Sequence, residues 1–355
     1  MNSLTRRSIF IFLSLVAFSV RGQDDVATPS LIESSQDTPQ RSLSLGYRNA
    51  FNIQSSFKHV GNIGRSNPGP ATGLTDHFYD DGYNRVDSTG NNHFGDESTT
   101  FWGYQDSSQY DSSGSGTIAM HSASSTGAGS SGNTDNPMPG LEVVYSQDVV
   151  VSKHWHAGVE GAFNYQRVLA NSSGPVNTTV THVTDVYQLN GAIPPTAPYD
   201  GPADQPGTLL GDTPTRTITT APETVTGSRN LEANLFGLRL GPYVEIPLYR
   251  IFSVTLSAGA TVVGVESKYD VNQTITIDTG TVPSVGSDIK GDVLFGGYAG
   301  GSLSAALSDN WSAFVGAQWQ HVGTYSHHSD VNGGGTAKLD LNNPIFVSAG
   351  VSFSF

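Results

Sequence analysis

Several side chains in the C-terminal third are of the types used in acyl-transfer chemistry. The run "SHHSD" places Ser326, Ser329 and Asp330 beside two histidines, and His321 lies shortly before it. A hydroxyl nucleophile, a histidine base and an orienting carboxylate together can carry out covalent hydrolysis. A chain with ten histidines can bring such a group together by chance. We therefore expect no enzyme and keep hydrolysis as the alternative.

Two other groups of side chains could bind a metal ion. The motif "HWH" sets His154 and His156 two positions apart, but no third ligand is evident, so a polar pair at an interface is preferred. A long acidic segment offers carboxylates to calcium: Asp76, Asp80, Asp81, Asp87 and Asp96. Their spacing does not fit the EF-hand template, and the chain has no cysteine. We predict no metal site and no cofactor.

The segments that must position these groups alternate between apolar and polar residues. In "WHAGVEGAFNYQR" every second residue from Trp155 is apolar or small, and "WSAFVGAQWQ" and the final "NPIFVSAGVSFSF" repeat the pattern. Such alternation predicts β-strands. We expect eight of them, at 43–60, 139–152, 155–169, 228–247, 252–270, 290–307, 311–327 and 338–355. The fourth changes phase, which predicts a bulge near Leu235.

The connections between these segments alternate between long and short. Short turns follow 152, 247 and 307, whereas long loops occupy about 61–138 and 170–227, with shorter ones at 271–289 and near 328–337. This asymmetry is typical of an antiparallel up-and-down transmembrane β-barrel, with short periplasmic turns and long extracellular loops. The Gly/Ser-rich part of the first loop is expected to be mobile and the Pro-rich part of the second to be extended. The aromatic residues of the first loop suggest that it folds over the barrel mouth.

The polar face of the predicted strands carries charges of both signs. If that face lines the interior, these residues pair with one another and plug the lumen: Arg48, Lys58, Glu142, Asp148, Glu160, Arg239, Glu245 and Asp292. Eight strands enclose a space just wide enough for side chains, whereas aqueous channels need about 16 strands. A general porin is therefore not expected.

Aromatic residues gather near both ends of the predicted strands. Trp155 and Trp311 lie at the short-turn end, and Tyr165, Trp319 and Phe57 lie toward the long loops. Two such girdles mark the two interfaces of a membrane barrel. A soluble β-sandwich or lipocalin-like barrel remains the alternative, because alternation does not tell which face is inside.

The N-terminus and the composition indicate export. Residues 1–22 have a basic start and an apolar run too short for a membrane helix, as in a cleaved signal peptide. Cleavage would remove three arginines and lower the formal charge from −14 to about −17, which argues against nucleic acid as a partner. Residues 23–42 are then a periplasmic segment, and 43–355 form the barrel.

In these features the chain resembles the small eight-stranded outer-membrane barrels, the class that contains the membrane domain of outer membrane protein A. The most specific match is the C-terminal "GVSFSF", in which Val351, Phe353 and Phe355 resemble the signal read by the barrel-assembly machinery. The resemblance implies a bacterial outer-membrane location and contact with outer-membrane lipid, lipopolysaccharide and that machinery. The first loop is longer than is usual in this class.

The predicted function is structural or surface-interacting, and the sequence does not identify an extracellular ligand. Some members of the resembled class modify lipid A with His and Ser at the depth of His321, so a lipid A-modifying enzyme is one alternative. A narrow pore for small solutes is the other.

Overall fold

The computed structural model describes residues 39–63, 67–72, 75–86, 93–94, 97–201, 207–277 and 280–355. All of them belong to one compact unit, Asp37–Phe355. The predicted signal peptide, most of the segment 23–42, Asp87 and Asp96 lie outside the described residues. No helix in the described part of the chain is long and apolar enough to span a bilayer.

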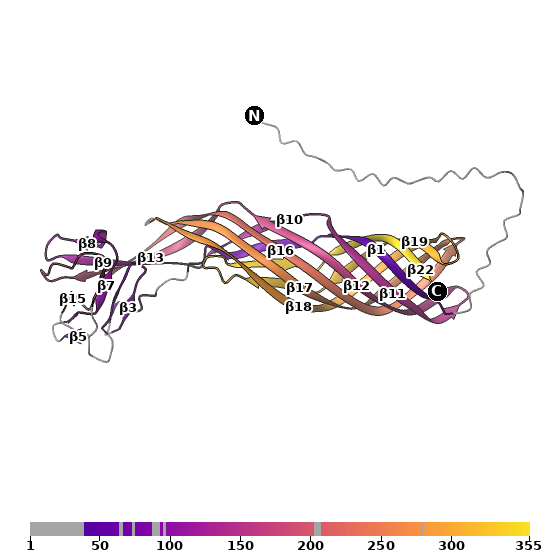
Figure 1. Cartoon of the computed structure of the whole chain (residues 1–355), viewed down its shortest axis with the longest axis horizontal. Helices are drawn as coiled ribbons and strands as arrows, with labels where there is room; N and C mark the ends of the chain where they lie inside the picture. The colour runs from indigo at the N-terminus through magenta and orange to yellow at the C-terminus, as the bar shows by residue number, and fades with distance from the viewer. Residues whose placement is uncertain are drawn as a thin grey trace, which may run out of the picture. The chain divides into compact units, whose positions relative to one another are not determined.

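Eight antiparallel strands pair in a closed cycle, and Figure 1 labels them along the barrel. In chain order they are β1 (Arg41–Phe51), β11 (Met138–Ser152), β12 (Trp155–Ser172), β16 (Thr215–Tyr249), β17 (Phe252–Ile277), β18 (Gly280–Ala306), β19 (Trp311–His321) and β22 (Ile345–Ser354). Each pairs with the next, and β22 returns to β1, from Ser42↔Ser354 to Phe51↔Ile345. The antiparallel all-β prediction is confirmed.

The sheet contains fifteen strands, more than the eight predicted. The additional strands are β2 (Gln54–Val60), β8 (Tyr110–Asp111), β9 (Thr117–Ser125), β10 (Ala128–Thr134), β13 (Val176–Gln188), β20 (Thr324–His328) and β21 (Thr336–Asp340). The segments predicted as loops 61–138, 170–227 and 271–289 therefore contribute strands. The Gly/Ser-rich stretch expected to be mobile forms most of β9 and β10. Pairing with neighbours such as β13 and β2 decides this, because its own residues are weak strand formers.

Short strands that follow β2 in the chain, from β3 to β15, form two small sheets apart from the main sheet. One contains β3 (His77–Phe78), β4 (Gly82–Asn84), β7 (Trp102–Tyr104) and β14 (Tyr199–Asp200). The other contains β5 (His93–Phe94), β6 (Ser98–Thr99) and β15 (Leu210–Gly211). A single 3₁₀ turn, η1 (Ser107–Gln109), is capped by Asp106.

Three of the predicted strands are interrupted. The predicted strand 43–60 breaks at Asn52, whose φ is 62°, and 311–327 breaks before Gly323, whose φ is 98°. The predicted strand 338–355 breaks between β21 and β22. After these breaks the chain changes partners: β2 pairs with β10 and β21 and not with a strand of the cycle.

The predicted bulge near Leu235 is absent, because the register of β16 runs without a shift from Arg229 to Glu245 against β12. The phase of the apolar residues changes for another reason. Leu231 is 2% exposed and faces the interior, whereas Leu240 is 63% exposed and faces outward. A straight strand thus passes from a region with an apolar interior to a region with an apolar exterior.

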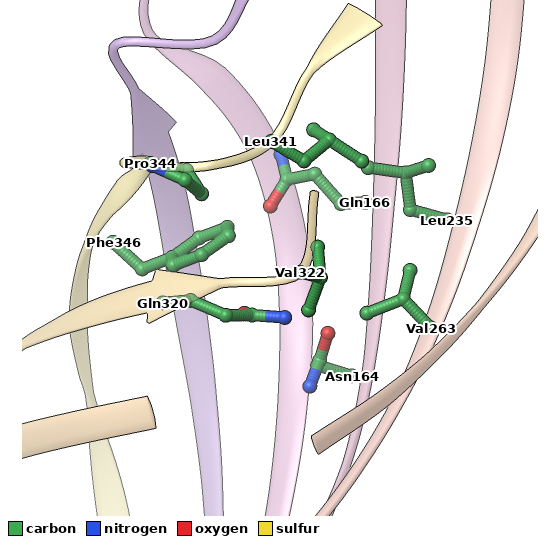
Figure 2. A pocket seen from close by; sticks show the side chains of 9 residues that line it. All are labelled: Asn164, Gln166, Leu235, Val263, Gln320, Val322, Leu341, Pro344 and Phe346. Carbon is green, nitrogen blue, oxygen red and sulfur yellow. The ribbon is translucent and has the colours of Figure 1, made fainter. Parts of the chain in front are cut away.

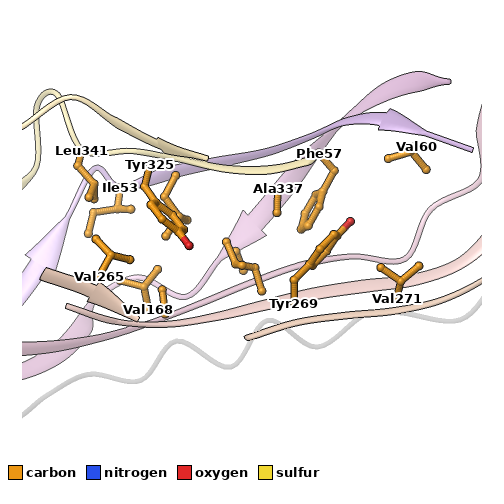
Figure 3. Close-up of a cluster of buried hydrophobic side chains, with 14 of the residues drawn as sticks. Ile53, Phe57, Val60, Val168, Val265, Tyr269, Val271, Tyr325, Ala337 and Leu341 are labelled. Carbon is orange, nitrogen blue, oxygen red and sulfur yellow. The ribbon is translucent and has the colours of Figure 1, made fainter. Parts of the chain in front are cut away.

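The apolar interior lies in the part of the barrel nearer the long connections, here called the upper barrel (Figure 3). Its largest members include Phe57 and Tyr269, whose ring centroids lie 5.8 Å apart, together with Ile53, Val265 and Tyr325. Its outer surface is mainly polar, as at Lys268 and Asp270, which pair at 2.8 Å, although Ile218, Val285 and Ile289 are exposed on it. This half of the molecule has the polarity of a soluble barrel.

Candidate functional site

The lower barrel, nearer the short turns, holds a layer of charged side chains in its interior. Arg48 Nη1 donates to Glu142 Oε2 at 2.8 Å, and both side chains are buried. Arg239 Nη2 lies 3.4 Å from Glu142, and Arg239 Nε lies 3.8 Å from Glu160. The Tyr298 hydroxyl donates to Glu160 at 2.9 Å. This ion-paired layer joins five strands of the cycle: β1, β11, β12, β16 and β18.

The Arg48 guanidinium is held from a second side as well. It lies 3.8 Å from the centroid of the Phe346 ring, in cation–π geometry. Phe346 is the one apolar residue on the otherwise small, polar face of the last strand. The aromatic ring and the Glu142 carboxylate together fix the cation across the interior.

A second polar group lies closer to the short turns. Asp148 accepts from the Tyr243 hydroxyl at 2.6 Å and from the backbone N–H of Gln40 at 3.1 Å, and His156 Nδ1 lies 3.3 Å from it. Glu245 is half-buried and stands opposite His156 in the register. His156 thus belongs to a polar pair in the barrel interior, whereas His154 is exposed in the turn.

Two charges predicted for the lumen do not lie there. Lys58 is exposed, because the chain reverses its inward and outward faces after Asn52 and directs Phe57 into the core. Asp292 is also exposed. It lies on a stretch of β18 that pairs on one side only, and its carboxylate accepts from the N–H of Val293 at 2.8 Å.

The aromatic residues predicted for the two girdles do not all lie on the outer surface. Trp155, Trp311 and Trp319 are exposed on the outer surface. Tyr165 is half-buried, and its hydroxyl donates to Asn234 at 2.8 Å. The prediction for Phe57 is wrong: this ring is completely buried in the upper core, because β2 has turned it inward.

The C-terminal strand closes the cycle with its apolar side outward. Val351, Phe353 and Phe355 are exposed, and the rings of Trp311 and Phe353 lie 5.1 Å apart. The Phe355 N–H donates to the Arg41 carbonyl at 2.9 Å, so the last residue is still paired with the first strand. The arrangement leaves three large apolar side chains in a row on the surface.

A small cavity of about 10 Å³ separates the charged layer from the apolar core (Figure 2). It is lined by the amides of Asn164, Gln166 and Gln320 and by Leu235 and Phe346. Such a volume holds roughly one water molecule. Gln166 Oε1, buried without a hydrogen-bond partner, is an acceptor for it. The interior therefore changes from charged to amide-lined to apolar over three successive layers.

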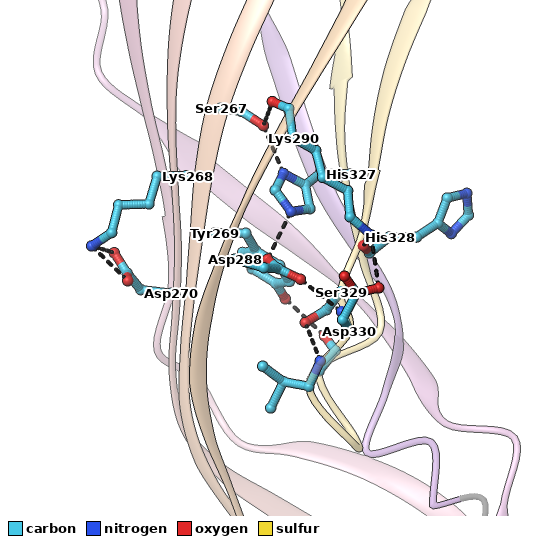
Figure 4. A network of polar contacts seen from close by, with 12 residues as sticks. Ser267, Lys268, Tyr269, Asp270, Asp288, Lys290, His327, His328, Ser329 and Asp330 are labelled. Atoms are coloured by element: carbon cyan, nitrogen blue, oxygen red, sulfur yellow. Dashed lines mark hydrogen bonds and ion pairs between the residues drawn. The ribbon is translucent and has the colours of Figure 1, made fainter.

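The residues considered for hydrolysis do not assemble as the sequence suggested. His321 is exposed, and its ring contacts the Asn342 carbonyl at 2.7 Å. The structure instead joins Ser267, His327 and Asp288, with Ser267 Oγ 2.6 Å from His327 Nδ1 and His327 Nε2 2.7 Å from Asp288 Oδ1 (Figure 4). Ser267 is 1% exposed and also contacts the Tyr325 hydroxyl at 2.6 Å. The Ser267 hydroxyl is thus packed between His327 and Tyr325.

Sequence reasoning missed this network, because its three members lie on three strands far apart in the chain. Polar residues at the inward positions of apolar strands are the one signal that points to it. Ser267 sits between Val265 and Tyr269 on the inner face of β17.

The described carboxylates of the acidic loop form paired contacts. Asp81 binds the ring of His121 at 2.6 Å, Asp76 binds Arg85 at 2.8 Å, and Asp80 accepts from the N–H of Ala123 at 2.9 Å. No group of three or more potential metal-binding side chains occurs among the described residues. Two of the five aspartates considered for calcium, Asp87 and Asp96, fall outside them.

The aromatic residues of the first loop pack into a cluster of their own. Trp102 stacks on Tyr104 at 5.7 Å, and Tyr79 meets Tyr187 edge to face at 6.3 Å. Ile118, Met120 and Leu210 complete it. The cluster, here called the aromatic head, is built on β9 and β13, strands that the sequence analysis had placed in loops. Phe78 remains exposed beside it.

No protein-family model matches the chain, and no curated protein sequence is significantly similar to it. Among solved structures it is similar to OprG from Pseudomonas aeruginosa, at 10% identity and a TM-score of 0.34, over 89% of this chain and 95% of that one. It is also similar to the outer membrane protease OmpT from Escherichia coli, at 10% identity and a TM-score of 0.31, over 90% and 98%. A third is Ail, the attachment invasion locus protein of Yersinia pestis, in complex with the heparin analogue sucrose octasulfate, at 9% identity and a TM-score of 0.29, over 89% and 99%.

Proposed function

We propose that the protein is an integral barrel of the bacterial outer membrane and that its membrane-spanning wall is the eight-strand cycle. An apolar belt supports this: large apolar side chains are exposed on all eight strands, among them Leu45, Leu141, Phe163, Leu240, Leu256, Leu303, Val315 and Val347. A strand that crosses a membrane needs about 9–11 residues. β16, β17 and β18 have 35, 26 and 27 residues, so they extend well beyond the belt.

We further propose that the lumen is closed to ions and solutes. The observation that carries this is the ion-paired layer of Arg48, Glu142, Arg239 and Glu160 inside the belt. A mainly apolar core lies above it, so a permeating ion would have to displace paired charges and then cross this packed core.

Recordings in planar bilayers with the purified, refolded protein test the closed lumen. We expect no stable conductance at the level of a general porin. Arg48→Ala with Glu142→Ala, which removes the central pair, is the matched variant, and the apolar core should keep it closed. A steady single-channel conductance of the unaltered protein would contradict the proposal and favour the narrow pore.

The proposed role of the closed barrel is to carry a surface structure outside the cell. Its support is the size of the upper barrel and the aromatic head, which exceed what is needed to close eight strands. Lipopolysaccharide is the expected neighbour of the apolar belt, and no nucleic acid is expected. Binding of cells expressing the protein to host or bacterial surfaces should be lost when residues 75–125 are replaced by a short turn.

A non-enzymatic protein is part of this proposal. The alternative, a lipid A-modifying enzyme, would change the mass of lipid A in cells that express the protein, and His321→Ala would abolish the change. We expect identical lipid A spectra with and without the protein. Labelling of Ser267 by a fluorophosphonate would likewise contradict the proposal, because a serine packed against His327 and Tyr325 should not react.

Recognition of the C-terminus by the barrel-assembly machinery is also proposed. Phe355 is well exposed, so its loss should cost the folded barrel about 1–3 kcal/mol at most. Deleting Phe355 should therefore lower the amount of protein in the outer membrane sharply, while refolding in detergent stays close to normal. Normal surface levels of the deletion variant would contradict the recognition, and failure to refold would show a structural role.

A further inference from the structure

The wall of the upper barrel contains a seam between β18 and β20. β18 pairs with β19 only from Gly297 to Ala306. Above Gly297 it pairs only with β17. β20 pairs only with β21. Within residues 280–355, all of which are described, no backbone hydrogen bond joins β18 to β20 or to the turn that follows it.

Side chains of β17 and β18 close this seam in place of a backbone ladder. They reach across to backbone groups of the turn between β20 and β21 (Figure 4). Lys290 Nζ donates to the His328 carbonyl at 2.6 Å and pairs with Asp330 at 2.9 Å. The Tyr269 hydroxyl donates to the Gly334 carbonyl at 2.8 Å, and Gln273 Nε2 donates to the Gly333 carbonyl at 2.6 Å.

The centre of the seam is the buried Ser267–His327–Asp288 network, here called the latch. With His327 neutral, every polar atom has a role: Nε2–H donates to Asp288, and Nδ1 accepts from the Ser267 hydroxyl. Ser267 in turn accepts from Tyr325. The other oxygen of Asp288 accepts from the N–H of Asp330 at 2.6 Å. One imidazole thus connects β20 to both β17 and β18.

Opening this seam would break no backbone pairing. The cycle of eight strands would remain closed, and the β20–β21 hairpin would remain paired to β2 from Gln54 to Lys58. Gly323, just before the hairpin, has a φ of 98°, and no atom beyond its chain neighbours lies within 4 Å of where a Cβ would be. Segments held by few hydrogen bonds open locally at a lower free energy than the whole fold.

We propose that the β20–β21 hairpin, Thr324–Asp340, is a detachable section of the wall, that the latch at His327 holds it shut, and that acidification releases it. Release would expose the apolar interior around Phe57, Tyr269 and Tyr325 on the side of β18. The inference needs neither a closed lumen nor a particular surface partner, so it stands apart from the proposed function.

The charges around His327 set the direction of the pH effect. Asp288 and Lys290 face it from β18, Ser267 and Tyr269 from β17, Tyr325 from β20, and Asp330 from the turn. Burial lowers the pKa of His327, while the hydrogen bond to Asp288 partly opposes this. The closed state therefore binds fewer protons than the open state, so closure is most favourable above about pH 6.5 and weakens as the pH falls below it.

Cysteine labelling can test this, because the chain has no cysteine of its own. Ala337, on the hairpin, and Ala162, on β12 in the lower barrel, are both buried, and β12 is paired on both sides at Ala162. We would make Ala337→Cys and Ala162→Cys separately in the refolded protein. The rate of labelling by a maleimide is then divided by the rate for the unfolded protein at the same pH. This ratio reports how readily the structure opens at each position.

We expect Cys at 337 to react at least about tenfold faster than Cys at 162, as for local opening. Lowering the pH from about 7.5 to about 5.5 should widen the difference. His327→Gln should raise labelling at 337 about tenfold and leave 162 unchanged, because it removes hydrogen bonds of the latch only. Equal rates at the two positions, or a parallel increase at both, would overturn the proposal.

A second measurement tests the proposal without the His327 variant, in case that variant fails to refold. A Cβ built on Gly286 lies 3.6 Å from the Cβ of Val331, within the range for a disulfide. Oxidised Gly286→Cys/Val331→Cys should slow amide hydrogen exchange of Thr324–His328 by at least about tenfold relative to the reduced protein, if the seam opens. Exchange that is the same in both forms would show that the hairpin does not detach.

Discussion

The lower and upper halves of this barrel share strands but have opposite polarity. In the lower half, Leu240 and its neighbours face outward and Arg48 and Glu142 face inward; in the upper half, Leu231 and Phe57 face inward and Lys268 faces outward. Neither the strand register nor the pleat changes along β16. The difference shows that a barrel wall does not have an intrinsic inside: each half places its apolar side chains away from water, whether that means toward lipid or toward a core.

The largest effect should come from the upper core. Phe57→Ala should lower the free energy of unfolding by about 3–5 kcal/mol, because it leaves a cavity against Tyr269. Phe163→Ala, in the apolar belt, is the control and should cost less, because this side chain is half exposed. Urea unfolding in detergent, followed by tryptophan fluorescence, measures both. Equal costs would mean that the two halves are packed alike.

The second-largest loss of stability should come from changes in the charged layer of the lower half. Arg48→Met leaves Glu142 buried with only the longer contact to Arg239, so we expect a loss of about 3 kcal/mol. Arg48→Met with Glu142→Met should regain most of it, because no unpaired charge remains. The same unfolding experiment applies. A double variant as unstable as the single one would show that the layer contributes more than charge compensation.

A charge on the outer surface should distinguish the halves directly. Leu240→Arg should cost about 2–4 kcal/mol in a bilayer, since it places a cation in the apolar belt. Ile218→Arg, on the upper part of the same strand and 59% exposed against 63% for Leu240, should change stability by less than about 0.5 kcal/mol. Unfolding from liposomes provides the measurement. If Ile218→Arg were equally harmful, the belt would extend into the upper barrel.

The smallest effect concerns the aromatic head. The hydrogen bond to Asp81 raises the pKa of His121, so the pair stabilises the head at low pH and loses this contribution as the pH rises through the raised pKa. The side chain is 38% exposed, so we expect no more than about 1 kcal/mol. Amide hydrogen exchange of β9 should be measured as the pH rises through the raised pKa of His121. It should speed up by more than the intrinsic exchange rate does, and Asp81→Asn should remove this additional acceleration.

Much of the lower half could be predicted from alternation. Trp155 and Trp311 are exposed where the short turns end and β12 and β19 begin, and Arg48, Glu142 and Glu160 lie inside. Both follow from period 2 and short turns. Phe57 and Lys58 could not be placed, because Asn52 reverses the faces through a backbone angle that the pattern does not show.

The strands of the upper half were harder to predict, because they form through contacts with partner strands and not through their own residue preferences. β9 and β10 are rich in Ser, Ala and Gly, and their strand character comes from the partners β2, β12 and β13. Local propensity for strands is weak and depends on context. The aromatic head likewise joins residues more than eighty positions apart, as in Tyr79 and Tyr187.

By itself the sequence determined that the chain forms antiparallel strands, where the tight turns fall, and which residues share a face, because a pleated strand alternates its side chains regardless of what surrounds it. Only the tertiary structure decided which face is inside at each height, how loops become strands, and that Ser267, Asp288 and His327 meet. Those outcomes depend on contacts between residues distant in the chain, and a local period contains no information about them.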